Sequence, residues 1–157
     1  MTELEELYRR HAADVHRFVL YLSGNAGDAD DITSETFFRA LRQRHVIQVS
    51  TAKAYLFTIA RNLWRRRRRN DGRHTPLPEA LPDVNPGLEQ WADGRQSLAA
   101  VLRALHELDE DDRAAILMRV DGVPYEDIAA SLQISVAAAK VRVYRARVRL
   151  SRSRRPQ

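Results

Sequence analysis

Apolar residues recur at three- and four-residue intervals along most of the chain, which is the spacing of one face of an α-helix. The first apolar stripe covers residues 4–22, and Thr2 followed by Glu5 predicts a capping box at its start. A second stripe covers residues 32–41, and its helix is predicted to open at residues 27–28 with three aspartates in its first turn. The chain is therefore expected to begin with two amphipathic helices.

The next segments alternate between helical and non-helical patterns. Residues 44–50 (RHVIQVS) are rich in β-branched side chains but lack helical spacing, and we interpret them as a loop. Helical spacing returns over residues 51–69 and breaks at Asn70. Residues 71–93 then hold four prolines and two glycines, a composition that buries too little apolar surface to offset its ordering entropy. We interpret this stretch as a linker.

Four further helices are predicted beyond the linker, over residues 98–108, 114–120, 125–132 and 136–150. A short helix, a three-residue turn and a longer helix are the length pattern of a helix-turn-helix. The predicted fold is all-α, with two small helical domains joined by a flexible acidic linker and a helix-turn-helix in the second domain. The expected boundaries are 1–70 for the first domain, 71–96 for the linker and 97–157 for the second domain.

The last predicted helix has two different faces. One face is apolar and is expected to be buried, with Val136, Ala139, Val143, Ala146 and Leu150. The opposite face carries Ala137, Ala138, Lys140, Val141, Arg142 and Arg145. No acidic residue occurs from position 135 onward, whereas a solvated face normally mixes both signs of charge. This pattern favours nucleic-acid binding, and the alternative is a basic amphipathic helix that only closes a small bundle.

Composition excludes several classes of protein. The 157 residues include no cysteine, which excludes disulfides, thiolate metal sites and a cysteine nucleophile. No run of about 18 apolar residues exists, and the acidic amphipathic N-terminus is no secretory signal, so we expect a soluble cytoplasmic protein without membrane insertion. The five histidines share no ligand spacing, and neither a glycine-rich phosphate loop nor a nucleophile elbow occurs. We therefore expect no metal, no cofactor and no catalytic residue.

The net charge of +5 conceals a segmented distribution. Residues 61–75 carry seven basic and one acidic side chain, and residues 135–157 carry eight basic and none acidic. Between them, residues 76–112 carry two basic and nine acidic side chains. Two basic regions on either side of an acidic stretch suggest two separate contacts with polyanions.

The first predicted domain offers a different kind of surface. Asp30, Asp31 and Glu35 share the second helix with Ser34 and Phe38, and an exposed aromatic beside carboxylates favours binding to a basic protein surface. A carboxylate catalytic or divalent-metal site is an alternative there, as is simple compensation of the helix dipole.

The third predicted helix combines aromatic side chains with the run Arg65–Arg69, a combination that suits unstacked single-stranded bases. A core Tyr55 beside a solvated arginine run is the alternative interpretation.

Three stretches of the chain resemble the extracytoplasmic-function sigma factors, the smallest class of bacterial sigma-70-type initiation factors. These stretches are DADDITSETFFRAL (28–41), TAKAYLFTIARNL (51–63) and ELDEDDRAAILMRVDGVPYEDIAASLQISVAAAKVRVYRARVRL (107–150). They occur in the order and at the spacing of the family and, with the helix before them, cover all but the linker and the tail. The strings TIARN (58–62) and YRAR (144–147) are the more specific parts.

The resemblance implies a transcription initiation factor, not an enzyme, that binds core RNA polymerase and directs it to promoter DNA. Its polymerase partners would be the beta-prime coiled coil and the beta flap, and an anti-sigma factor commonly holds family members inactive. The positions matching the polymerase contact are Asp30, Asp31, Ser34, Glu35 and Phe38. The acidic linker would thread the RNA exit channel, where its negative charge would mimic nucleic acid.

The resemblance also divides the promoter between the two domains. The minus-ten element would be read as single-stranded non-template DNA by Arg44, His45, Lys53, Tyr55, Arg61, Asn62 and Arg65. The minus-thirty-five element would be read as duplex by Ser135, Ala137, Ala138, Lys140, Arg142 and Arg145.

Two departures from the family pattern concern the residues that would read the minus-thirty-five element. Gln133 replaces the usual turn glycine, and Ala137-Ala138 replaces a more usual Gly-Thr. The competing hypothesis is a one-component helix-turn-helix regulator that acts without core polymerase.

Overall fold

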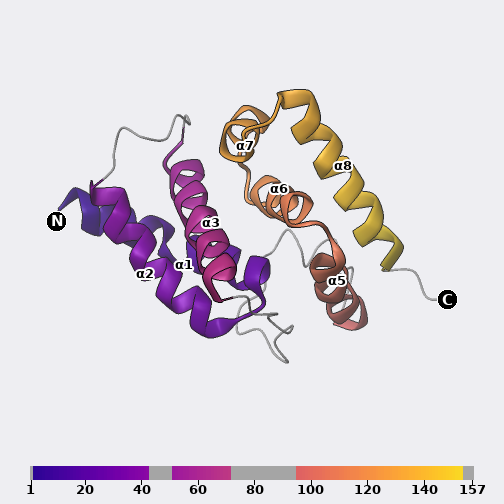
Figure 1. Cartoon of the computed structure of the whole chain (residues 1–157), viewed down its shortest axis with the longest axis horizontal. Helices are drawn as coiled ribbons and strands as arrows, with labels where there is room; N and C mark the ends of the chain where they lie inside the picture. The colour runs from indigo at the N-terminus through magenta and orange to yellow at the C-terminus, as the bar shows by residue number, and fades with distance from the viewer. Residues whose placement is uncertain (1, 43–50, 72–94, 154–157) are drawn as a thin grey trace.

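The structure is a computed structural model that describes residues 2–42, 51–71 and 95–153. Within these ranges every secondary-structure element is a helix, which confirms the predicted all-α fold. The N-terminal lobe contains α1 (Glu3–Ser23), α2 (Ala26–Arg42) and α3 (Ala52–Asp71). The C-terminal lobe contains α5 (Arg95–Glu107), α6 (Glu110–Val120), α7 (Tyr125–Leu132) and α8 (Val136–Ser153). Figure 1 shows the two lobes side by side, with α3 on the side that faces α6 and α7.

Local capping explains where several helices begin and end. The Thr2 hydroxyl accepts a hydrogen bond from the Glu5 amide at 3.1 Å, as the predicted capping box requires. Gly24 ends α1 in the left-handed conformation at φ 73°, which glycine adopts without a Cβ clash. The Asn25 side chain then accepts a hydrogen bond from the Asp28 amide at 2.8 Å. α2 therefore begins at Ala26, and only Asp28 lies in its first turn, which corrects the prediction of three aspartates there.

The expected loop and linker cannot be compared with the structure, because residues 43–50 and 72–94 lie outside the described residues. The bounds of the flanking helices do correct one expectation about charge. Four of the nine acidic residues counted in 76–112 occupy positions 109–112, at the N-terminus of α6. The negative charge of that stretch therefore belongs partly to the C-terminal lobe and not to the linker alone.

The cores of the two lobes differ in composition. In the N-terminal lobe the rings of Phe18 and Phe57 stack with centroids 4.5 Å apart, and Trp64 is also buried. In the C-terminal lobe the largest fully buried side chains are aliphatic or methionine: Leu105, Ile116, Met118, Ile128 and Leu150. The predicted buried stripe of α8 is confirmed, since Ala139, Val143, Ala146 and Leu150 are buried and Val136 packs against the core.

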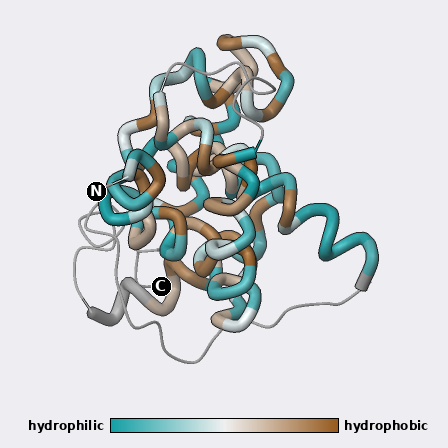
Figure 2. The backbone as a smooth tube through the Cα atoms, turned by 90° about the vertical axis from the view of Figure 1, so that its left-hand side faces the viewer, coloured by the Kyte–Doolittle hydropathy of each residue, from teal (hydrophilic) through white to brown (hydrophobic). Residues whose placement is uncertain are grey.

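Hydrophobic and hydrophilic positions alternate along the tube in Figure 2, as expected of amphipathic helices. α6 differs, because its seven consecutive residues 112–118 are all buried. None of the helices in ranges 2–42, 51–71 and 95–153 combines the length and the hydrophobicity that a membrane span requires.

Polar contacts join the two lobes. The Thr58 hydroxyl of α3 donates to the Ser131 hydroxyl of α7 at 2.8 Å, and Lys53 Nζ donates to the Asp121 carbonyl at 3.2 Å. The guanidinium of Arg113 in α6 is buried and donates to the Leu22 carbonyl of α1 at 2.7 Å. The same guanidinium donates to the carbonyls of Leu105, His106 and Leu108, at distances of 2.7 to 3.2 Å. One buried cation thus ties the C-terminal ends of α1 and α5 to α6.

Candidate functional site

The outer face of α2 presents the predicted polymerase contacts together. Ala29, Ile32, Thr36, Phe37 and Ala40 turn toward the core, and the hydroxyls of Thr33 and Thr36 donate to the carbonyls four residues earlier. The opposite face is left to the solvent. All five predicted residues are exposed there: Asp30, Asp31, Ser34, Glu35 and Phe38.

The acidic side chains on this face contact neighbouring basic side chains. Asp30 lies 2.8 Å from His16 Nε2, and Asp31 accepts from Arg67 of α3 at 3.2 Å. Glu35 accepts from Arg39 at 3.0 Å. Exposed pairs of this kind contribute only about 0–1 kcal/mol, so a partner with a basic surface can replace them at little cost.

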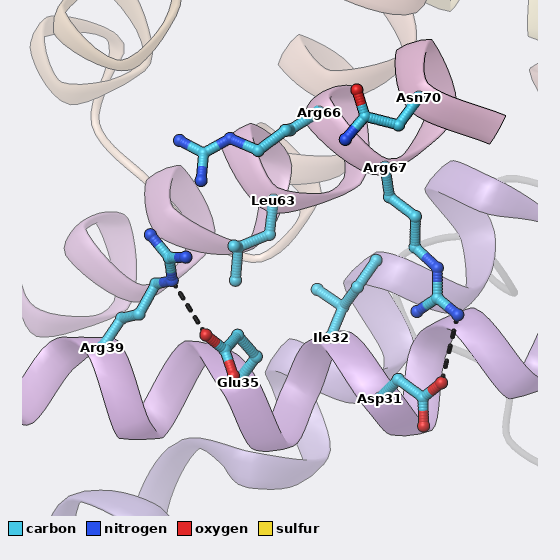
Figure 3. Close-up of a pocket in the computed structure, with 8 residues that line it drawn as sticks. All are labelled: Asp31, Ile32, Glu35, Arg39, Leu63, Arg66, Arg67 and Asn70. Carbon is cyan, nitrogen blue, oxygen red and sulfur yellow. Dashed lines mark hydrogen bonds and ion pairs between the residues drawn. The ribbon is translucent and has the colours of Figure 1, made fainter. Parts of the chain in front are cut away.

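Phe38 and a neighbouring groove add apolar surface to this face. Phe38 is 54% exposed, and the guanidinium of Arg42 lies 5.4 Å from its ring centroid. Between α2 and α3 lies a groove of about 370 Å³. In Figure 3 Ile32 and Leu63 point toward each other in the groove, while the Asp31–Arg67 and Glu35–Arg39 pairs lie on its rim. Ile32 is only 3% exposed, so the half-buried Leu63 is the apolar side chain that a protein helix could reach there.

The carboxylates of α2 can be compared with the alternative of a divalent-metal site. Among the residues that the structure describes, no three His, Asp or Glu side chains gather in a way that could hold a metal ion. Asp31 and Glu35 instead each contact a guanidinium.

The predicted minus-ten residues on α3 divide between solvent and the interface with the C-terminal lobe. Asn62 and Arg65 are exposed, whereas Lys53 and Tyr55 are half-buried and Tyr55 packs against the core. Arg61 is buried, and its guanidinium donates to Asp111 of α6. Burial lowers the pKa of Arg61, while the Asp111 carboxylate acts in the opposite direction. Arg44 and His45 lie outside the described residues.

The predicted helix-turn-helix is present in α7 and α8. Gln133 adopts the left-handed conformation at φ 58° and ψ 47°, and the Ile134 amide donates to the Ala129 carbonyl at 3.0 Å. A left-handed residue other than glycine costs roughly 1 kcal/mol, and the turn carries this cost at Gln133, where the resemblance implied a glycine. The Ser135 hydroxyl accepts from the Ala138 amide at 3.0 Å, which caps α8.

The exposed face of α8 contains most of the predicted minus-thirty-five residues. Ser135, Ala137, Lys140 and Arg145 are exposed, whereas Ala138 and Arg142 are half-buried. Val141 is 56% and Tyr144 is 70% exposed on the same helix. The sequence reasoning did not select Tyr144, although its spacing of four from Lys140 and seven from Ala137 would have placed it on this face.

Both arginines of this predicted set, Arg142 and Arg145, form hydrogen bonds with carboxylates. Arg142 donates to Asp109 at 2.9 Å and to Asp112 at 2.8 Å. Arg145 makes two hydrogen bonds to Asp112, at 3.0 and 3.1 Å. The hydrogen bonds to Asp112 raise the pKa of Arg145. Partial burial acts to lower the pKa of Arg142, but its hydrogen bonds to Asp112 and Asp109 raise it.

Two helical lobes, the second a helix-turn-helix with a basic exposed face, are typical of a DNA-binding protein. Residues 7–74 match the family model for Sigma-70 region 2, and residues 98–150 match that for Sigma-70, region 4. The second match lies within the described C-terminal lobe, whereas the first also includes residues 43–50 and 72–74, which lie outside the described residues.

Relatives cover nearly the whole chain. The ECF RNA polymerase sigma factor SigE of Mycolicibacterium smegmatis is 35% identical over 156 residues, which is 96% of this chain and 61% of SigE. The ECF RNA polymerase sigma factor EcfG of Rhodopseudomonas palustris is 39% identical over 144 residues, which is 85% of this chain and 75% of EcfG. The chain therefore spans about three-fifths to three-quarters of the length of these two relatives.

A solved structure agrees with these relatives. The sigma factor RpoE from Bartonella quintana, in complex with the anti-sigma factor NepR, superimposes with a TM-score of 0.75 at 28% sequence identity. The match covers 98% of this chain and 97% of RpoE. The chain belongs to the extracytoplasmic-function (ECF) sigma factors of the sigma-70 family.

Proposed function

We propose that the chain binds core RNA polymerase through the exposed face of α2 and directs the enzyme to specific promoters. The observation that carries this proposal is the grouping of Asp30, Asp31, Ser34, Glu35 and Phe38 on one exposed face beside an apolar groove. A one-component regulator would need only the C-terminal lobe, whereas the family match includes both lobes. The chain itself makes and breaks no bond and acts in the cytoplasm, where the polymerase is.

The two lobes divide the promoter between them in this proposal. The N-terminal lobe reads the minus-ten element as single strand, with Asn62 and Arg65 exposed on α3. The C-terminal lobe reads the minus-thirty-five element as duplex through the exposed side of α8, where Lys140 and Tyr144 support the assignment. The domain limits proposed for this division are 1–70 and 97–157, with the linker between them.

An anti-sigma factor is the second proposed partner. The related RpoE is bound by NepR in its solved structure. The groove between α2 and α3 offers apolar surface within charged rims, so an inhibitor helix seated there would compete with core polymerase for the face of α2.

Run-off transcription with core polymerase over a promoter library tests the proposed function. The parent chain is expected to give discrete promoter-directed transcripts, whereas Glu35→Lys is expected to abolish core binding and transcription by reversing a charge at the centre of the α2 face. Glu6→Lys is the matched control, because Glu6 is an exposed carboxylate on α1 that pairs with Arg10. Tight sequence-specific duplex binding without polymerase, and no transcript with it, would refute the proposal.

A further inference from the structure

One tyrosine ring in the C-terminal lobe contacts cations from two neighbouring helices. The guanidinium carbon of Arg119, in the last turn of α6, lies 4.2 Å from the centroid of the Tyr125 ring. Lys140 Nζ, on α8, lies 5.7 Å from the same centroid. Because Tyr125 is the first residue of α7, its ring links all three helices of this end of the lobe (Figure 1).

The turn between α6 and α7 brings Tyr125 back to Arg119. Gly122 follows α6 at φ 86°, and its amide donates to the Arg119 carbonyl at 2.9 Å. Pro124 then precedes α7 as an N-cap in the extended conformation. The Arg119 guanidinium also donates to the Val123 carbonyl at 3.2 Å. This hydrogen bond and the ring together fix the direction of the guanidinium.

The two cations at this ring differ from the other predicted DNA contacts of α8. In the part of the chain that the structure describes, neither Arg119 nor Lys140 pairs with a carboxylate, whereas Arg142 and Arg145 both bind Asp112. The quadrupole of an aromatic ring attracts cations, but the ring carries no net charge. The positive charges of Arg119 and Lys140 are therefore left for an anion from outside the chain.

The position of the cluster indicates which anion. Lys140 is exposed and Tyr125 is half-buried, so the cluster lies at the surface. Lys140 shares the exposed side of α8 with Ala137 and Tyr144. In a helix-turn-helix the first helix lies across the DNA backbone while the second enters the major groove. The start of α7, beside the exposed side of α8, would then face backbone phosphates, which guanidinium and ammonium groups both bind.

We infer that Tyr125 is a positioning residue, whose ring directs Arg119 and Lys140 toward phosphates of the DNA backbone. This inference rests on the proposed function, because it takes α8 to be the helix that reads duplex DNA. It adds Arg119 to the residues that contact the duplex. Contacts with phosphates fix the position of the lobe on DNA and carry no direct sequence information, so their loss should weaken binding to every sequence alike.

The salt dependence of DNA binding measures such contacts. The full chain is titrated with a mixed-sequence DNA duplex at a series of potassium chloride concentrations. Arg119→Ala and Lys140→Ala should each reduce the slope of log K against log salt by about one, the value for one lost phosphate contact. Arg103→Ala, at an exposed position on α5, is the matched control and should keep the parent slope.

Two further substitutions test the ring. Tyr125→Phe keeps the ring and should keep the parent slope. Tyr125→Leu removes the ring but keeps an apolar side chain, and the slope should fall by up to about two because both cations lose their support. In the double variant Arg119→Ala/Lys140→Ala, adding Tyr125→Leu should change nothing more, since the ring then has no cation to position.

Several results would overturn the inference. The parent slope in Arg119→Ala or in Lys140→Ala would show that the cation does not contact a phosphate. A slope as low in Tyr125→Phe as in Tyr125→Leu would assign the effect to the hydroxyl. A further loss from Tyr125→Leu in the double variant would make Tyr125 a structural residue only. If circular dichroism shows that Tyr125→Leu is unfolded, the two alanine variants and Tyr125→Phe decide.

A free phosphate ion is an alternative ligand of the same chemistry. Replacing chloride by inorganic phosphate at equal ionic strength should preserve the difference in Kd between the parent chain and Arg119→Ala, because the duplex also contacts the rest of α8. Disappearance of this difference would mean that the cluster binds the free ion, and would overturn the assignment to DNA.

Run-off transcription separates this inference from the proposed function. Promoter-directed transcripts from a chain whose salt slope does not respond to Arg119→Ala would overturn the inference alone. Slopes that change as described, in a chain that directs no transcription with core polymerase, would overturn the proposed function and leave the phosphate contacts supported.

Discussion

Helices α3 and α8 are both strongly basic, yet the structure presents them in different ways. On α3 the predicted DNA-binding residues include a buried Arg61 and a half-buried Lys53 that face the C-terminal lobe. On α8 the predicted residues are exposed or half-buried, and Asp109 and Asp112 of the same lobe bind the two arginines. Basic charge in a sequence therefore identifies a candidate contact with DNA, but the packing of neighbouring helices decides whether that contact is available.

The largest effect is expected from removing the buried cation that anchors the C-terminal lobe. Arg113→Ala should lower the free energy of unfolding by at least about 3 kcal/mol, because buried carbonyls lose charge-assisted hydrogen bonds. Because α3 is covered only while the C-terminal lobe is folded against it, this change should expose α3 and remove its difference from α8. Urea denaturation measures the effect, and exposed Arg103→Ala on α5 is the control. Equal stability of the two variants would contradict the anchoring role.

A smaller effect is expected from Arg142→Ala, which tests whether the arginines of α8 leave their carboxylates for DNA. If Arg142 binds the minus-thirty-five element, its loss should cost about 1–3 kcal/mol of affinity for that element and leave core binding unchanged. Run-off transcription from promoters with and without the upstream element measures this difference. Arg152→Ala, an exposed position near the end of α8, serves as the control. An unchanged preference for the upstream element would mean that Arg142 stays with Asp109 and Asp112 on DNA.

The smallest effect concerns pH and the burial of His106 near the C-terminal end of α5. Burial, together with the charges of Arg113 and Arg68, lowers the pKa of His106 from 6.5 to about 4. The unfolded chain therefore binds a proton at His106 below pH 6.5 that the folded chain binds only near pH 4, and folding stability should fall between these values as the pH is lowered. His106→Gln should reduce this fall, as measured by the urea midpoint at each pH. The same pH profile in the parent chain and in the variant would contradict the assignment.

The sequence predicted the helices well because their signals are local. The Thr2 cap, the left-handed position at Gln133 and the buried stripe from Ala139 to Leu150 each depend on residues within a few turns of one another. The exposed face of α2 was also predictable, since it is the complement of the buried stripe.

The partners of the arginines were not predictable. Arg61 and Asp111 are 50 positions apart, and Arg142 and Asp112 are 30 apart, so no helical periodicity relates them. Summing charge over residues 76–112 assigned the acids at 109–112 to the same stretch as the linker, and only the fold places them between two basic helices. The roles of individual residues toward polymerase and DNA remain predictions for the same reason, because they depend on partners outside the chain.

The hydrogen bond from Arg113 to the Leu22 carbonyl has a consequence for the order of synthesis. α1 has no basic residue in its last turn, so the buried cation near its C-terminal carbonyls comes from the other lobe. N-terminal domains generally fold first as a chain is made, and here the first lobe emerges from the ribosome without that cation. The end of α1 is completed only once residue 113 has emerged and α6 has formed, so the N-terminal lobe made alone should be less stable than the same lobe within the whole chain.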